Sequence, residues 1–293
     1  MADLNIQVIE TILMVFSFLI GSMIGSFLNV CVYRMPLGLS VVKPRSKCPK
    51  CDKPIVWYDN IPMLSWLILG AKCRNCDQPI SWQYPLVEAI TGTLFLCVFL
   101  RFGIVIATPI YMLLAAGLVL VTFVDLSDWT IPNEVTIPGV FIGIGCSVVG
   151  MFYPESGLRV VSPLDAIGAG ALGGGILYAL DKISLLLLKK RGMGFGDVKL
   201  LAMLGTFIGW QSVILNIVVA SVLGSIVGIT MIAMQRGKQT IKDDDSQEMT
   251  GHYLPFGPYL VVGGLIVLFF GPEIIEAYLN VLQVPAAAPT IPM

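Results

Sequence analysis

The stretch Arg191-Gly-Met-Gly194-Phe-Gly196-Asp197-Val-Lys199 is a short, glycine-rich, charged segment between two apolar runs, at 164–187 and 198–210. An ionisable side chain at the edge of a membrane segment is costly to place there, so it marks a functional site by default. Asp197 is such a side chain. The glycines just ahead of it remove side-chain bulk, which lets another backbone approach the carboxylate. The positions of the other apolar runs indicate whether a second carboxylate lies at the same depth in the membrane.

The composition indicates a polytopic membrane protein. Of 293 residues, 56% are hydrophobic and 13% are charged, and the mean hydropathy is +0.84, whereas soluble domains carry about 25% charged residues. A membrane-spanning helix needs roughly 20 apolar residues. We therefore expect an all-α fold with about eight transmembrane helices, near 8–30, 83–100, 105–124, 135–152, 164–187, 198–210, 211–234 and 255–271. The net charge of −1 indicates no nucleic-acid partner.

The basic residues set the orientation of these helices in the lipid bilayer. Sixteen of the 18 lysines and arginines lie in or beside alternate loops, and only Arg101 and Arg159 fall on the opposite side. Loops rich in lysine and arginine stay in the cytoplasm. We therefore expect 31–82, 125–134 and 188–199 to be cytoplasmic. Seven spans would break this alternation, so the charge pattern favours eight.

Four of the seven cysteines form two C-x-x-C pairs, Cys48 with Cys51 and Cys73 with Cys76, separated by 21 residues. Each pair can supply two thiolates from one tight turn, which suits tetrahedral Zn²⁺. Because disulfides are disfavoured in the cytoplasm, we expect a structural zinc in a small ribbon-like loop domain. A redox dithiol and an unmetallated loop are the alternatives. Four protein thiolates leave no position for water, so this zinc would fold the loop and would not catalyse.

A second carboxylate, Asp125, directly follows the third apolar run, 72 residues before Asp197 and at the same predicted membrane boundary. Two carboxylates in a poorly hydrated site share one proton. One can then activate water while the other, protonated, polarises a peptide carbonyl, which is the chemistry of an aspartic protease. The alternative is that each aspartate caps a helix or pairs with a lysine. Asp128, one turn further on, is expected to be a cap or a solvated acid.

Two further patterns bear on other enzyme classes. The single histidine, His252, cannot form an H-E-x-x-H zinc site and is not placed for a serine or cysteine relay near Asp125. The string at 168–173 spells G-x-G-x-x-G, but no strand precedes it and it lies within an apolar run. Small residues in a membrane span usually permit close helix packing, and we expect that role here and at Gly21 and Gly25.

Six short strings occur in order along nearly the whole chain: Gly25-Ser-Phe-Leu-Asn-Val-Cys-Val-Tyr-Arg-Met-Pro36, the double C-x-x-C loop, Ile80-Ser-Trp-Gln-Tyr-Pro-Leu-Val-Glu88, Asp125 with Ile131-Pro-Asn133, Gly194-Phe-Gly-Asp197, and Pro255-Phe-Gly-Pro-Tyr259. In this order they resemble the bifunctional type IV prepilin leader peptidases with N-methyltransferase activity.

The resemblance implies an intramembrane aspartic endopeptidase in which Asp125 and Asp197 are catalytic, supported by Gly194, Gly196 and Lys199. It implies a multi-pass protein of the bacterial inner membrane whose active site faces the cytoplasm. There it would cleave the leader peptide of type IV prepilins and of secretion-system pseudopilins.

The resemblance also implies methylation of the new N-terminus by S-adenosylmethionine. No Rossmann-type methyltransferase domain fits in the chain, so the donor needs another site. We place that site on the cytoplasmic face, around Asn29, Tyr33, Arg34 and Glu88.

With these roles, the chain divides into a first transmembrane helix at 1–30, a cytoplasmic four-cysteine zinc-binding domain at 31–82, a seven-helix aspartic peptidase core at 83–271 and a non-cytoplasmic tail at 272–293. Two alternatives stay open. The protein is a peptidase alone, with the zinc loop serving substrate docking, or it is a membrane transporter or scaffold whose aspartates carry protons or cap helices.

Overall fold

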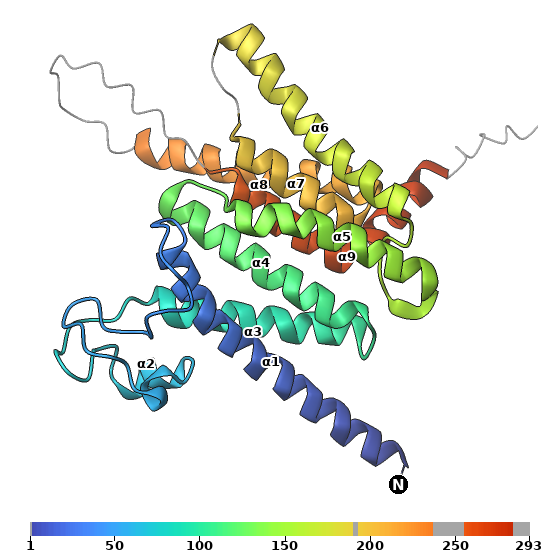
Figure 1. Ribbon diagram of the computed structural model, residues 1–293. Coiled ribbons are helices and arrows are strands. Elements are labelled where there is room, and N and C mark those ends of the chain that lie inside the picture. Colours follow the sequence, from blue (N-terminus) through green and yellow to red (C-terminus); the bar gives the residue numbers. More distant parts are fainter. Residues whose placement is uncertain (1, 190–192, 237–254, 284–293) are drawn as a thin grey trace, which may run out of the picture.

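The computed structural model describes residues 2–189, 193–236 and 255–283. The acidic run at 243–245, His252 and the tail at 285–293 lie outside this part of the chain. The described residues form helices joined by loops, with no named strand (Figure 1). The α-helices are α1 (Ala2–Arg34), α2 (Leu64–Ile68), α3 (Gln83–Phe102), α4 (Ala107–Asp128), α5 (Asn133–Phe152), α6 (Pro163–Leu188), α7 (Phe195–Ile208), α8 (Trp210–Arg236) and α9 (Gly257–Gln283).

Each apolar run that predicted a transmembrane helix is helical. Among the described residues, 7 helices are long and apolar enough to cross a membrane: α1, α3, α4, α5, α6, α8 and α9. The sixth run forms α7, which has only 14 residues and is almost wholly buried between its neighbours. The prediction of an all-α polytopic membrane protein is therefore confirmed, with seven full-length helices and one short buried helix.

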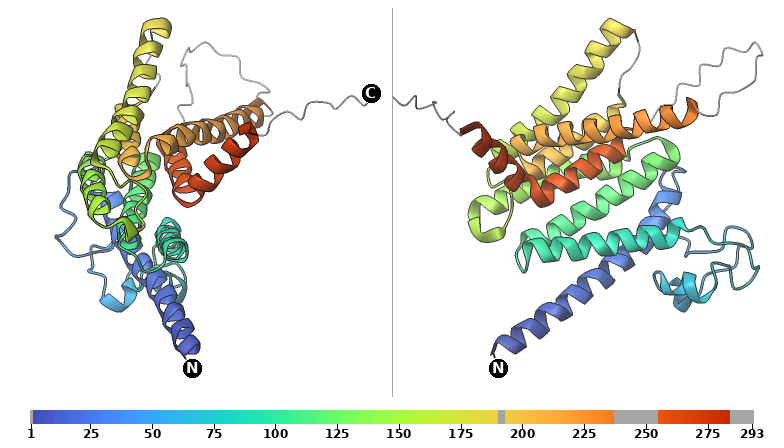
Figure 2. Two further views of the ribbon diagram at one scale, coloured as in Figure 1. Left: turned by 90° about the vertical axis from the view of Figure 1, so that its right-hand side faces the viewer. Right: turned by 180° about the vertical axis from the view of Figure 1, so that it is seen from behind.

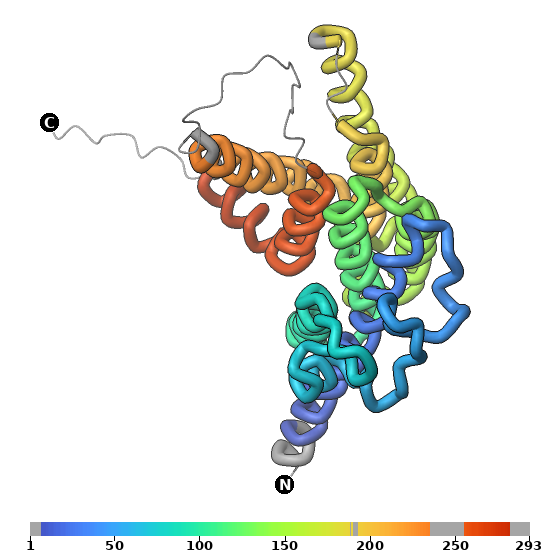
Figure 3. Tube along the Cα trace, turned by 90° about the vertical axis from the view of Figure 1, so that its left-hand side faces the viewer, coloured from blue at the N-terminus to red at the C-terminus, as the bar shows by residue number. Residues whose placement is uncertain are grey.

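The most buried of the long helices is α4, which joins the two halves of the bundle. Its side chains Tyr111, Leu118 and Val121 pack into a core shared with α7, α8 and α9. On another face, Val119 and Val124 pack into a second core built from α1 and α3. Figures 2 and 3 show α1, α3 and the cysteine loop on one side of α4, with α8 and α9 on the other. Asp125, near the end of α4, therefore lies where the two halves meet.

Glycines bring two helix pairs into close contact. A Cβ on Gly25 would lie 2.8 Å from the Glu88 Cα, so α1 and α3 meet almost backbone to backbone. A Cβ on Gly173 would lie 2.9 Å from the Leu201 carbonyl oxygen, and one on Gly205 would lie 2.5 Å from the Ala169 carbonyl oxygen. The G-x-G-x-x-G string is therefore a packing surface between α6 and α7, as predicted.

The loops alternate between the two ends of the bundle. The cysteine loop, the turn from α4 to α5 and the start of α7 lie toward the left of Figure 1, and the connection from α5 to α6 lies toward the right. Some boundaries differ from those expected. Helix α1 continues to Arg34, and α9 continues through Pro272 to Gln283, so the divisions at 30/31 and 271/272 both fall inside helices.

Candidate active site

Asp125 lies in the last turn of α4, which ends because Trp129 adopts a left-handed conformation and returns its N–H to the Asp125 carbonyl at 3.0 Å. Its side chain is buried, with 5% of the residue exposed. The carboxylate oxygen Oδ2 has no hydrogen-bond partner among the described residues. A buried carboxylate oxygen without a partner is unusual. It faces the start of α9, where the Gly257 backbone packs against it.

Asp197 lies in the first turn of α7 and is also buried. Its Oδ2 accepts the Gly194 N–H at 3.3 Å, so the side chain does cap its own helix. A helix N-terminus favours a negative charge at this position. The carboxyl group of Asp125 also acts electrostatically on that of Asp197. The capping alternative is thus correct for Asp197, but it does not account for the burial of a second acid beside it.

Ile131 connects the segments that carry the two aspartates. A Cβ on Gly196 would lie 2.8 Å from the Ile131 Cβ, and one on Gly257, at the start of α9, would lie 3.2 Å from its Cδ1. The same Cβ on Gly257 would overlap the Asp125 carboxylate. The missing side chains at these glycines allow the start of α7 and the start of α9 to close around Asp125.

The lysine near the aspartates contacts another group. Lys199 donates to the Asn133 side-chain oxygen and lies 5.3 Å from the centre of the Phe195 ring. No ion pair joins a lysine or arginine to either buried aspartate in the described part of the chain. Lys199 therefore links the start of α5 to the start of α7. The alternative in which each aspartate pairs with a lysine finds no support.

Asp128, the competing acid of the first motif, is exposed. It accepts a hydrogen bond from the Thr130 hydroxyl at 3.2 Å, as expected for a solvated acid in a turn. Burial therefore separates Asp125 from Asp128, although the two lie one helical turn apart. Two buried carboxylates on segments packed together, without a cation, are the arrangement in which one proton can be shared. Such a pair offers one base and one acid at the same place.

The four predicted metal ligands form a separate cluster in the loop between α1 and α3. The sulfur atoms of Cys48, Cys51, Cys73 and Cys76 all lie within 4.8 Å of one another. The Cys48 and Cys76 sulfurs are 3.8 Å apart. A tetrahedral ion with Zn–S bonds of about 2.3 Å places its sulfurs about 3.8 Å apart, so this group has the dimensions of a four-thiolate metal site.

The two halves of the cysteine cluster have the same backbone structure. The N–H of Cys48 bonds to Lys53 and that of Cys73 bonds to Gln78, at 3.0 and 2.9 Å. A β-bridge closes each turn, from Lys47 to Pro54 and from Lys72 to Pro79. Two copies of one turn therefore face each other across the sulfurs. In the second turn, Arg74 holds Asp59 through two hydrogen bonds, at 2.7 and 2.6 Å.

Three of the four residues predicted to hold the methyl donor make structural hydrogen bonds: Glu88 and Arg34 attach the cysteine loop to α3 and α1, and Asn29 joins α1 to α3. The Glu88 carboxylate accepts the Met63 N–H at 2.7 Å. The Asn29 amide donates to the Tyr84 carbonyl at 3.1 Å. Arg34 donates to the carbonyls of Ser40 and Pro44, both at 2.9 Å. Tyr33 differs, since 59% of it is exposed.

Comparison with known proteins shows which family the sequence matches. The sequence pattern of the Bacterial Peptidase A24 N-terminal domain matches residues 19–102, and that of the Type IV leader peptidase family matches residues 112–229. A prepilin leader peptidase/N-methyltransferase of Aeromonas salmonicida (strain A449) is 34% identical over 290 residues, covering 90% of this chain and 93% of its own length. The chain belongs to the type IV leader peptidase family.

Two further relatives carry the same description. The prepilin leader peptidase/N-methyltransferase of Pseudomonas aeruginosa (strain PAO1) is 33% identical over 285 residues, covering 89% of this chain and 92% of the relative. That of Myxococcus xanthus (strain DK1622) is 37% identical over 234 residues, covering 80% of this chain and 67% of the relative. No solved structure matches the chain.

Both aspartates lie in the segment matched by the leader peptidase family, and all four cysteines lie in the segment matched by the N-terminal domain. Gly257, which closes against Asp125, lies beyond both matched segments. The P-F-G-P string around Gly257 and the I-P-N string that begins at Ile131 were recognisable as family motifs, but the sequence did not predict that either one contacts the aspartates. The feature that could have pointed to Gly257 is its position directly at the start of an apolar run, which it shares with Gly196.

Proposed function

We propose that this member of the type IV leader peptidase family cleaves the leader peptides of type IV prepilins and pseudopilins and then methylates the new N-terminus. The relatives' printed names combine both activities, and they align with most of this chain. The observation that carries the peptidase assignment is that two buried acids, Asp125 and Asp197, lie on segments that pack together through Ile131, with no ion-paired cation among the described residues.

In the proposed reaction, the ionised member of the pair removes a proton from a water molecule, which attacks the scissile carbonyl. The protonated member donates a hydrogen bond to the carbonyl oxygen as negative charge develops there. Gly194 keeps the approach to Asp197 free of a side chain, Gly196 lets Ile131 pack closely beside it, and Lys199 holds α5 against α7. Because Asp125 Oδ2 accepts no hydrogen bond from the described side chains, Asp125 is the proposed base for this water.

The cysteine cluster is proposed to hold a structural Zn²⁺. Its four sulfurs fit a tetrahedral thiolate site, and the domain around them is too small for a substantial core of its own. When bound, the ion supplies folding energy to the loop at 31–82 and takes no part in peptide hydrolysis. All seven cysteines are unpaired, as expected for a loop in the cytoplasm.

S-adenosylmethionine is the proposed methyl donor. The proposed site remains the junction between the cysteine loop and the helices, around Asn29, Tyr33, Arg34 and Glu88. The hydrogen bonds of Asn29, Arg34 and Glu88 hold this junction in shape. Exposed Tyr33 offers an aromatic surface that suits a sulfonium cation.

The proposed location is the bacterial inner membrane, with the aspartates on the cytoplasmic side. The lysine and arginine distribution supports this orientation. It also suits the substrate, since a prepilin is an apolar helix with a basic leader and its cleavage site lies at the cytoplasmic interface.

The decisive peptidase experiment replaces each acid in turn in the purified full-length protein. Asp125→Asn and Asp197→Asn should each lower leader cleavage by at least about 10²-fold, since removal of an acid–base group costs about 10²–10⁴-fold. Asp128→Asn is the matched control and should retain cleavage. If Asp125→Asn or Asp197→Asn still cleaves at the normal rate, the aspartic protease assignment is wrong. The result would then favour the transporter or scaffold alternative.

The methyltransferase activity needs its own assay. Purified protein is incubated with an already cleaved pilin and labelled S-adenosylmethionine, so that the result does not depend on the peptidase. Label should appear on the pilin N-terminus with both the wild type and Asp197→Asn. Absence of label with an active wild-type peptidase would leave the peptidase-only alternative.

A further inference from the structure

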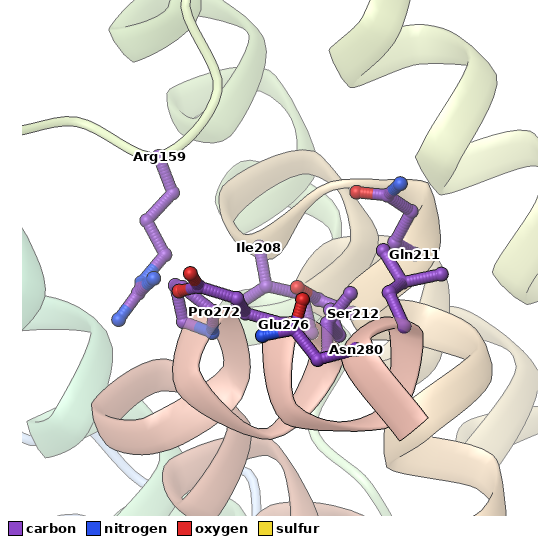
Figure 4. Close-up of a pocket in the computed structure, with 9 residues that line it drawn as sticks. Arg159, Ile208, Gln211, Ser212, Pro272, Glu276 and Asn280 are labelled. Carbon is purple, nitrogen blue, oxygen red and sulfur yellow. The ribbon is translucent and has the colours of Figure 1, made fainter. Parts of the chain in front are cut away.

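A pocket of about 460 Å³ lies at the end of the helix bundle opposite the two aspartates. Helices α5, α7 and α9 each begin beside the aspartates, and the pocket lies beside the far parts of α7 and α9 and the connection after α5. Figure 4 shows Arg159 entering from that connection, with Glu276 and Asn280 on α9. The proposed peptidase and methyl-transfer reactions use no residue of this pocket.

The guanidinium group of Arg159 is fixed in place but not fully paired. Pro272 lacks an N–H, so the Leu268 carbonyl one turn earlier in α9 has no helical donor. Arg159 donates to that carbonyl, and its guanidinium lies 5.8 Å from the centre of the Phe102 ring. Its Nε is buried and has no hydrogen-bond partner in the described chain. The guanidinium is held at the wall of the pocket, and a fixed guanidinium suits a phosphate oxygen.

The remaining lining makes a free anion a poor fit. Glu276 lines the same pocket, and no ion pair joins it to Arg159 among the described residues. Glu273, which pairs with Arg101, lies outside the lining but also acts on the Arg159 guanidinium. Within the lining, the pocket offers one positive and one negative group that form no ion pair with each other. A ligand carrying both a phosphate and an ammonium group can pair with both, whereas Glu276 repels bare phosphate.

The surroundings indicate that such a ligand comes from the membrane. Ile208, Ile275 and Leu279 supply apolar lining beside the polar side chains of Gln211 and Asn280. The neighbouring α8 packs against α9 on one face but keeps much of its apolar surface exposed, with only 6% of its membrane window fully buried. A headgroup in this pocket can therefore continue into acyl chains along the helices.

We propose that this pocket binds a zwitterionic phospholipid headgroup with a primary ammonium, with its phosphate at Arg159 and its ammonium at Glu276. The site is separate from the aspartates and from the cysteine cluster. By holding the far parts of α7 and α9 together with the α5-to-α6 connection, the lipid stabilises the helices whose first turns form the aspartate site.

The test titrates delipidated full-length protein with phosphatidylethanolamine, phosphatidylglycerol or inorganic phosphate, and native mass spectrometry measures the bound species. The wild type should prefer phosphatidylethanolamine. Glu276→Gln should weaken phosphatidylethanolamine binding about two- to five-fold, as for a partly exposed charge pair, and should strengthen phosphatidylglycerol binding. Arg159→Gln should weaken both lipids by about ten-fold or more.

Glu155→Gln, an exposed acid of the same connection that does not line the pocket, is the matched control and should bind as the wild type does. Equal phosphatidylethanolamine binding by the wild type and Glu276→Gln overturns the proposal. Binding of inorganic phosphate as tight as that of the lipid overturns the lipid assignment. If Arg159→Gln fails to fold, Glu276→Gln and Gln211→Ala still test lipid binding at this pocket. Both variants should fold, because neither side chain makes a hydrogen bond among the described residues.

Discussion

The cysteine cluster and the aspartate site are assembled over different distances in the chain. The four sulfurs come from two copies of one tight turn, and each copy is closed by its own backbone hydrogen bonds. The two carboxylates come from the end of α4 and the start of α7, and Gly257 from α9 completes their surroundings. The first centre is therefore a property of a local segment, whereas the second is a property of helix packing.

This difference implies that the two centres can be damaged independently. The loop contacts the helices through a few hydrogen bonds, such as that from Met63 to Glu88. The aspartates instead depend on close approaches that involve Gly196, Gly257 and Ile131. Removing a thiolate should therefore change the metal content first, and adding one methyl group at a close approach should change cleavage first.

The largest effect is expected from removal of one thiolate. Cys48→Ser should lower bound zinc from about one ion per chain to near zero, because metal binding and loop folding are one event. Far-ultraviolet circular dichroism should still show the transmembrane helices, and atomic absorption should measure the metal.

Cys146→Ser, which changes a single cysteine in α5 outside the cluster, is the control and should keep the zinc. Asp125→Asn should keep it as well. Loss of zinc from Asp125→Asn would mean that the two centres are not independent.

A smaller effect is expected from one added methyl group at the aspartates. Gly257→Ala places a Cβ against the Asp125 carboxylate, and such overpacking costs about 1–3 kcal/mol. Cleavage should fall about 10- to 100-fold with normal zinc content. Gly145→Ala, where no atom lies within 4 Å of the new Cβ, is the control. Normal cleavage by Gly257→Ala would show that this approach does not shape the site.

A weaker effect is expected from the contact between α5 and α7. Lys199→Met removes the hydrogen bond to Asn133, and cleavage should fall about three- to ten-fold, as for an exposed bond to a charged donor. Asn133→Ala should cause a similar loss. The double variant should be no worse than either single variant, because both remove the same contact. Additive losses would assign the two residues separate roles.

The smallest effect is expected in the acid stability of the cysteine loop. Hydrogen bonds from Arg74 hold the pKa of Asp59 below its ordinary value. A lowered folded-state pKa adds stability above the ordinary carboxyl range, and this stability is lost as the pH falls through the folded pKa. Asp59→Asn removes it, so zinc release on acidification should begin a few tenths of a pH unit higher.

Asp52→Asn is the control for this experiment, since the Asp52 side chain pairs with Lys47 but is 71% exposed. Its release curve should follow that of the wild type. Identical curves for Asp59→Asn and the wild type would show that the pair formed by Asp59 and Arg74 does not contribute to the loop.

The same difference in assembly explains what could be predicted from the sequence. The spacing of Cys48, Cys51, Cys73 and Cys76 predicts their meeting, because each turn is local. The meeting of Asp125 with Asp197 could be predicted only as a shared depth, since apolar runs indicate depth but not which helices touch. The contact of Gly257 with Asp125 depends on how α9 packs against α4, and no periodicity carries that information.

The pocket at Arg159 could not be predicted from the sequence either. Arg159 could be assigned only to the side of the membrane that is poor in basic residues. Its position depends on a carbonyl freed by Pro272, 113 residues later. The residues chosen for the methyl donor illustrate the same limit, because Asn29 and Glu88 lie in conspicuous motifs and yet make structural contacts, Asn29 between α1 and α3 and Glu88 between α3 and the cysteine loop.

The shortness of α7 has a consequence for how a substrate reaches Asp197. Its 14 residues rise about 21 Å at about 1.5 Å per residue, whereas the hydrocarbon core of a bilayer is about 30 Å thick. Because most of α7 is buried by its neighbours, the longer helices α6 and α8 meet the lipid in its place. Asp197, in the first turn of α7, therefore lies inside the bundle and not on its lipid-facing surface. A peptide bond must enter between the helices to reach it, so the depth of cleavage is set by the protein.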